Sequence, residues 1–74
     1  MTLDQAKDAA LKLNNKFNIC DVYENGYHFY TYSDLDVDGD NGAVVLEDGR
    51  VVTWIHFILN YHPSKKPIKT LIIK

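Results

Sequence analysis

The residues best suited to chemistry are four aspartates at alternate positions, Asp34, Asp36, Asp38 and Asp40, in a segment that ends at Gly42. Carboxylates this close together repel one another unless a cation or a basic group neutralises them. The spacing therefore indicates a solvated loop, a cation site or a surface offered to a basic partner.

Calcium is the cation that this pattern suits best. Alternate oxygen ligands followed by a glycine at the sixth position are typical of an EF-hand loop, and Asp34 to Gly39 has this form. The eighth position is Asn41, however, and the twelfth, which should be a bidentate glutamate, is Val45. The preceding Tyr27–Ser33 also favours a strand over a helix. Weak calcium binding by the four aspartates stays open as an alternative, and no other cofactor is expected.

Other catalytic and metal-binding patterns are incomplete. His56 and His62 lie six positions apart with no cysteine pair to complete a zinc set. Cys20 falls on an expected core face, which favours an inert thiol over a nucleophile. A nucleophile elbow, a phosphate loop and a dinucleotide fingerprint are all missing from the sequence. We therefore expect no enzyme and no catalytic residue, and we expect surface positions for His28 and His62.

Length and composition predict one globular domain over residues 1–74, since 46% of the residues are hydrophobic and 24% are charged. A single cysteine excludes an intramolecular disulfide and favours a reducing compartment, so we expect a cytoplasmic protein. The longest apolar run, Trp54–Leu59, is interrupted by His56 and is too short to span a membrane.

The net charge of −2 conceals an uneven distribution of charge. After Arg50 the chain carries four lysines and no acidic residue. This basic end is too sparse for a nucleic-acid groove, so no direct nucleic-acid binding is expected. Between Lys16 and Arg50 the chain has acidic residues and no basic one, which favours a protein partner with a basic surface. These acidic residues are Asp21, Glu24, Asp34, Asp36, Asp38, Asp40, Glu47 and Asp48.

The elements that must position these residues begin with a helix over about residues 3–14. Thr2 and Gln5 have the form of a capping box, and Asn14-Asn15 is a plausible stop. One apolar stripe recurs at helical spacing and predicts the side that faces the core: Leu3, Ala6, Ala10, Leu13 and Phe17.

Asn25-Gly26 between two β-prone runs predicts a hairpin with a type I′ turn. A two-residue turn there would place Val22 opposite Phe29 and Cys20 opposite Thr31. The other face of this hairpin is aromatic with polar tips, and it carries Tyr23, His28, Tyr30 and Tyr32.

Asp48-Gly49 predicts a second hairpin, in which Val45 would face Val52 and Ala43 would face Trp54. Both of its strands are apolar on both faces, as expected for central strands. The segment after Trp54 fits either a continuing strand, which we favour, or a short helix capped by Thr53. Ile68–Lys74 is predicted as a short final strand with lysines near its ends.

Together these elements predict an α+β fold, with one N-terminal helix packed on a four- to five-stranded antiparallel sheet built from two hairpins. The helix covers only one face of that sheet. The predicted core is Leu3, Ala10, Leu13, Val22, Phe29, Val45 and Val52.

The aromatic face is therefore the second candidate for partner binding, beside the acidic segment. Tyrosine is enriched at interfaces because its ring buries a large rigid area while its hydroxyl stays satisfied. Two alternatives remain open. These side chains could lie on a sheet face that is exposed to solvent, or the last strands of the chain could cover them. The residues concerned are Tyr23, His28, Tyr30 and Tyr32.

Three segments of this chain resemble known patterns: Leu3 to Leu13 with alanines at 6, 9 and 10, then Gly26-Tyr27-x-Phe29-Tyr30, then Gly42 to Val51 with its Asp-Gly turn. The arrangement resembles immunity protein 35 of bacterial toxin systems and the PepSY-like domains. That resemblance covers about residues 3–53 and implies a small helix-plus-sheet domain that binds and inhibits a protein without catalysis. Phage and mobile-element inhibitors of defence complexes also act by binding and blocking a protein.

The alternatives are a small calcium-binding domain and a domain that homodimerises through its sheet. The protein is expected to be a monomer or a homodimer.

Overall fold

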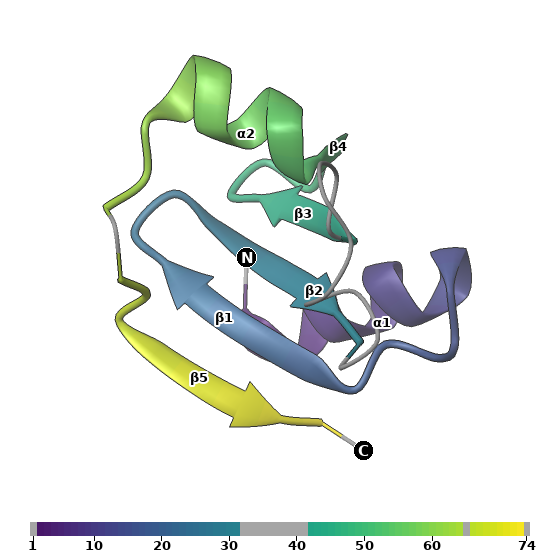
Figure 1. The fold of residues 1–74 in the computed structure, drawn as a ribbon. Helices are drawn as coiled ribbons and strands as arrows, with labels where there is room; N and C mark the ends of the chain where they lie inside the picture. Colours follow the sequence, from purple (N-terminus) through teal and green to yellow (C-terminus); the bar gives the residue numbers. More distant parts are fainter. Residues whose placement is uncertain (1, 32–41, 65, 74) are drawn as a thin grey trace.

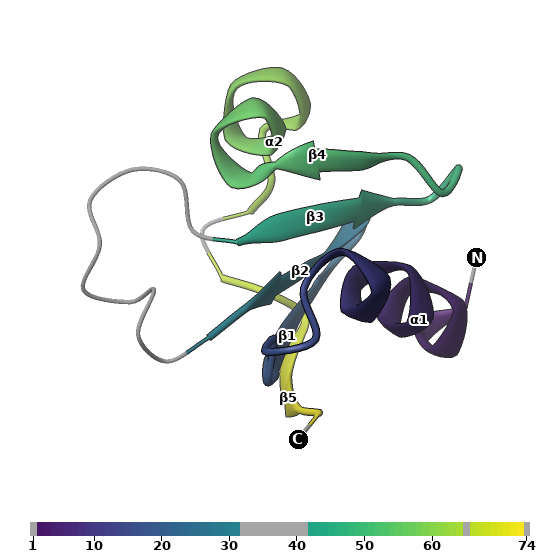
Figure 2. The same cartoon turned by 90° about the vertical axis from the view of Figure 1, so that its right-hand side faces the viewer.

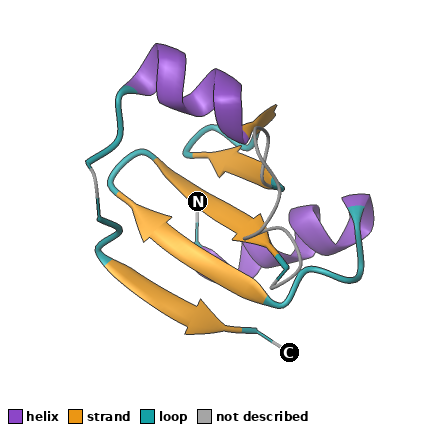
Figure 3. Ribbon diagram, in the orientation of Figure 1, coloured by secondary structure: helices purple, strands orange, loops and turns teal. Residues whose placement is uncertain are grey.

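The computed structural model describes residues 2–31, 42–64 and 66–73, and within them the fold is α+β, as predicted. Two helices and one antiparallel five-stranded sheet make up the domain, with strand order β4-β3-β2-β1-β5 (Figures 1 and 3). In chain order the elements are α1 (Leu3–Leu13), β1 (Ile19–Tyr23), β2 (Gly26–Tyr30), β3 (Ala43–Leu46), β4 (Val51–Thr53), α2 (Trp54–Tyr61) and β5 (Lys69–Ile72).

Helix α1 begins and ends where the sequence predicts. The Thr2 hydroxyl accepts a hydrogen bond from the Gln5 amide at 3.2 Å, and the Gln5 side chain accepts one from the Thr2 amide at 3.0 Å. Asn14 ends the helix, and its amide donates to the Ala10 carbonyl. Ala6 and Ala10 are fully buried against the sheet. The prediction that Leu13 is a core residue is wrong: α1 packs on β2 and β3, and the side chain of its last residue lies exposed at the β4 edge.

The first hairpin has the predicted faces but a register shifted by two residues. Tyr23 pairs with Gly26 and Cys20 with Phe29, so the two turn residues are Glu24 and Asn25. A shift of two keeps every side chain on its predicted face. Gly26 lies inside β2, where a Cβ atom would come within 2.9 Å of Val44 Cγ1, and this close packing explains the glycine better than a turn does.

The second hairpin differs from the prediction by one residue. Its loop has three residues, because the Leu46 amide donates to the Arg50 carbonyl at 2.8 Å and Gly49 takes a φ of +91°, as in a type I turn with a bulge. Val45 therefore pairs with Val51, and Val52 pairs with Val44. Since a shift of one exchanges the two faces, Val52 points to the side opposite α1. β3 is buried along its length, whereas β4 is an edge strand and not the central strand predicted.

The segment after β4 is a helix, so the strand favoured from the sequence is wrong. The Thr53 hydroxyl accepts a hydrogen bond from the His56 amide at 3.1 Å, which caps α2. Trp54, Phe57 and Tyr61 recur at helical spacing and pack on the sheet. These aromatic contacts decide in favour of the helix over the strand that the β-prone residues of this segment also permit.

Both faces of the sheet are covered, by α1 on one side and α2 on the other (Figure 2). On the α1 side, Ala6, Ala10, Phe17, Cys20, Phe29, Ala43 and Val45 form the core. A second cluster of Tyr23, Val44, Leu46 and Phe57 lies under α2. After α2 the chain crosses to the far edge, where β5 pairs antiparallel with β1. Neither helix among the described residues is long and apolar enough to cross a membrane.

Candidate partner-binding surface

The aromatic face predicted as a binding surface is part of the interior. Tyr23, His28 and Tyr30 are each at most 8% exposed. The His28 imidazole stacks between the rings of Trp54 and Tyr30, with centroid distances of 4.1 and 4.7 Å. The surface position expected for His28 is therefore wrong, and for Tyr23 and Tyr30 the alternative of cover by a later part of the chain holds. Helix α2, which the sequence did not resolve, supplies the cover.

A hydrogen-bond network holds the β1–β5 side of this aromatic group. Asp21 accepts hydrogen bonds from the Tyr30 hydroxyl at 3.0 Å and from the Thr70 hydroxyl at 2.6 Å. Burial, and then the nearby Asp21 carboxylate, raise the pKa of Tyr30 above its ordinary value. The same two causes raise the pKa of Tyr23. Both phenols are thus held neutral, Tyr23 as a packing group and Tyr30 also as a hydrogen-bond donor, which suits a structural role.

Cys20 is the one thiol of the chain and is fully buried. Burial, with a smaller effect of Asp21, raises its pKa to about 12. A nucleophilic cysteine needs a lowered pKa and access to solvent. The expected inert thiol is consistent with this environment.

The acidic segment lies outside the described residues. Asp34, Asp36, Asp38 and Asp40 belong to it, as does Tyr32, so their predicted roles in calcium or partner binding stay predictions. Among residues 2–31, 42–64 and 66–73, the structure groups no three histidine, cysteine or acidic side chains in a way that could hold a metal ion.

The largest apolar feature that sequence reasoning missed is the outer side of α2. Ile55, Ile58 and Leu59 are 42%, 39% and 67% exposed, and their spacing of three and four residues places them on one side of the helix. Trp54, Phe57 and Tyr61 occupy the inner side. We call Ile55, Ile58 and Leu59 the outer surface of α2. The sequence did contain a clue: six of the eight residues in this helix are apolar. A helix that buries only one side needs fewer apolar residues than that.

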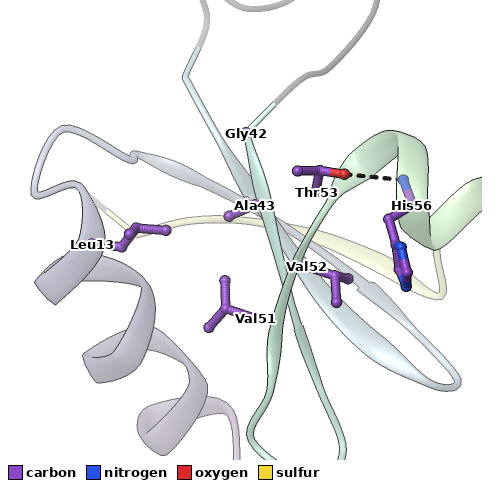
Figure 4. Close-up of a pocket in the computed structure, with 7 residues that line it drawn as sticks. All are labelled: Leu13, Gly42, Ala43, Val51, Val52, Thr53 and His56. Atoms are coloured by element: carbon purple, nitrogen blue, oxygen red, sulfur yellow. Dashed lines mark hydrogen bonds between the residues drawn. The ribbon is translucent and has the colours of Figure 1, made fainter.

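A cleft of about 460 Å³ lies at the β4 edge, between the end of α1 and the first turn of α2 (Figure 4). Leu13 and Val51 line one part of it, while Val52 and His56 line the part toward α2. The Thr53 hydroxyl oxygen there already accepts the His56 amide, and most of the described lining is apolar. The cleft can therefore accept an apolar side chain of a partner.

Comparison of the chain with protein-family models, with curated proteins and with solved structures finds no match. The resemblance to immunity protein 35 and the PepSY-like domains is therefore neither supported nor opposed. What the chain does must be inferred from its own surfaces.

Proposed function

We propose that this chain is a small non-catalytic protein-binding module whose main contact is the outer surface of α2. The observation that carries the proposal is the exposure of Ile55, Ile58 and Leu59 on a helix whose inner side already holds the aromatic core. A helix with apolar side chains on both its inner and its outer side normally has both sides covered. In a domain of this size, the natural cover for its outer side is another protein.

The spacing of these side chains suits a known mode of recognition. Apolar anchors at positions i, i+3 and i+4 are how an amphipathic helix lies in a groove of its partner. Each aliphatic side chain contributes about 1.5–3 kcal/mol when it passes from full exposure to full burial. Because all three are already part-buried, their joint contribution is a few kcal/mol at most, and further contacts must supplement it.

Charge supplies the second part of the proposal. The residues between Lys16 and Arg50 include eight acidic side chains and no basic one, which favours a partner with a basic surface. The acidic segment joins β2 to β3, and Gly42, the first described residue after it, lines the same cleft as His56 of α2 (Figure 4). The proposed contact would thus use the outer surface of α2 for apolar contacts and the acidic residues before Gly42 for attraction to a basic partner.

The role that fits these features is inhibition, as the resemblance also implies. An acidic module that covers a basic protein surface blocks whatever that surface binds, nucleic acid included. Such a role needs neither a cofactor nor a catalytic group. The buried, unreactive Cys20 suits a reducing, cytoplasmic setting.

The test is capture of a partner from a lysate of the native host with Leu59→Glu as the bait. A charge in the middle of the contact should reduce the bound partner at least tenfold, an effect of about 1.4 kcal/mol or more. Ile68→Glu is the matched control, since Ile68 is an aliphatic residue of similar exposure that lies outside both α2 and the cleft. The proposal fails if the wild-type chain and Leu59→Glu retain the same proteins in equal amounts, or if Ile68→Glu alone loses them.

A further inference from the structure

Strand β5 forms one edge of the sheet, and no described element lies beyond it (Figure 1). The Ile73 amide donates a hydrogen bond to the Asn18 carbonyl at 2.9 Å, so the backbone groups of Ile73 face β1. Two residues earlier, Leu71 lies opposite Cys20 of β1. Successive residues of an antiparallel strand direct their backbone groups alternately toward each side. The backbone groups of Leu71 therefore face β1, while the amides and carbonyls of Thr70 and Ile72 face outward.

Two exposed apolar side chains lie at this edge, one just before β5 and one at its end. Ile68 is 64% exposed and Ile72 is 62% exposed. Unpaired backbone groups beside exposed apolar side chains form a template for another strand, and proteins usually protect such edges. The opposite edge offers less strand to pair with, because β4 is only three residues long and turns directly into α2.

We propose that the β5 edge binds β5 of a second copy of this chain, antiparallel, so that two five-stranded sheets form one continuous sheet. A two-fold axis at Leu71 places Thr70 opposite Ile72 of the second copy. All four outward backbone groups of each chain are then hydrogen-bonded across the interface. The surface is self-complementary, which a pairing of identical strands requires.

Charge is compatible with this register. Lys69 lies opposite Ile73 of the second copy, so the two Lys69 side chains stay at opposite ends of the paired strands. Like charges directly opposite each other, which destabilise strand pairs, are thereby avoided. The apolar Leu71 side chains meet at the centre.

The pairing involves a different element from the outer surface of α2, so it goes beyond the proposed function and does not depend on it. Because β5 has only four residues, the contact buries less than the ~800 Å² per partner of a standard interface. We expect a weak dimer that forms in the upper micromolar range.

Analytical ultracentrifugation over a concentration series tests this pairing. The molar mass of the wild-type chain should rise from 8.5 kDa toward twice that value as concentration increases. Ile72→Pro should stay at the monomer mass, because it removes an outward amide that β1 does not use and adds a ring at the contact. Val51→Pro is the matched control. Val51 follows Arg50, whose carbonyl accepts the Leu46 amide across the hairpin, so by alternation the Val51 amide faces outward at the β4 edge. This variant should associate like the wild type.

Amide hydrogen exchange gives a second readout that needs no variant. The Thr70 and Ile72 amides should exchange quickly in dilute solution and slow down as concentration rises. A wild-type chain that keeps the monomer mass and fast Thr70 and Ile72 exchange at all concentrations would overturn the proposal. So would a dimer that Val51→Pro abolishes and Ile72→Pro leaves intact. Slow exchange appearing only with an added acidic peptide would assign the edge to a foreign strand and equally refute pairing with a second copy.

Discussion

At the scale of single residues, the burial of Cys20 links stability to pH. In the folded chain, burial raises the pKa of its thiol from 9.0 to about 12, whereas the unfolded chain ionises near the ordinary value. The folded state therefore holds a proton that the unfolded state releases above about pH 9. Under that condition the free energy of unfolding falls as pH rises. The stabilising contribution is complete below pH 9 and is lost progressively toward pH 12.

Cys20→Ala should remove this part of the pH dependence. Urea unfolding at about pH 7.5 and about pH 9.5 measures it, because tyrosines ionise mainly above the upper value. We expect the wild-type chain to lose more stability than Cys20→Ala between the two conditions, although the variant is less stable at both because of the cavity it creates. Equal losses for the two proteins would show that the thiol is not buried as described.

At the scale of elements, α2 is the part on which both the core and the proposed surface depend. Its inner aromatic residues cover the second face of the sheet, and its outer surface is exposed. A helix of eight residues is too short to be stable alone in water. Its end cap and its aromatic contacts therefore have to hold it in place.

Thr53→Ala should weaken α2 by removing the oxygen that accepts the His56 amide. The expected loss is about 1 kcal/mol of unfolding free energy, measured by thermal or urea unfolding. Trp54 is the one tryptophan of the chain and lies next to the cap, so its fluorescence reports the same event locally. Thr53→Ser keeps the oxygen and should behave like the wild type. If Thr53→Ala and Thr53→Ser are equally stable, the cap does not contribute as described.

The sequence predicts α1 well because its determinants are local. Thr2, Gln5 and the buried alanines lie within a few residues of one another, and each favours the same helix. The faces of the first hairpin were also predictable, because they follow from alternation, whereas the extra loop residue of the second hairpin exchanged the faces of its last strand. The registers were not: Gly26 was taken for a turn residue, although its role depends on Val44 and Phe57, which are distant in the sequence.

The segment of α2 shows why the candidate site was only partly predictable. Its β-branched and aromatic residues suit a strand, its spacing suits a helix, and only packing on the aromatic face decides between them. Burial of Tyr23, His28 and Tyr30 and exposure of Ile55, Ile58 and Leu59 follow from that one decision. These six positions cannot be divided into buried and exposed ones from the sequence alone.

At the scale of the whole molecule, three groups of exposed apolar side chains remain among the described residues after both faces of the sheet are packed. They are the outer surface of α2, Leu13 and Val51 at the cleft beside β4, and Ile68 and Ile72 at the β5 edge. They belong to different elements, with β4 and β5 at opposite edges of the sheet. A partner on α2 and a second copy on β5 can therefore be bound at the same time.

Methyl cross-saturation NMR of the isotope-labelled chain, bound to the partner that the capture experiment retains, tests the central claim most directly. Saturation of the partner should attenuate the methyl signals of Ile55, Ile58 and Leu59, while the buried Val44 and Val45 stay unaffected. Val44 and Val45 serve as internal controls because both are fully buried. Attenuation confined to Leu13, or to Ile68 and Ile72, with unchanged signals from α2 would contradict the assignment of the partner to the outer surface of α2.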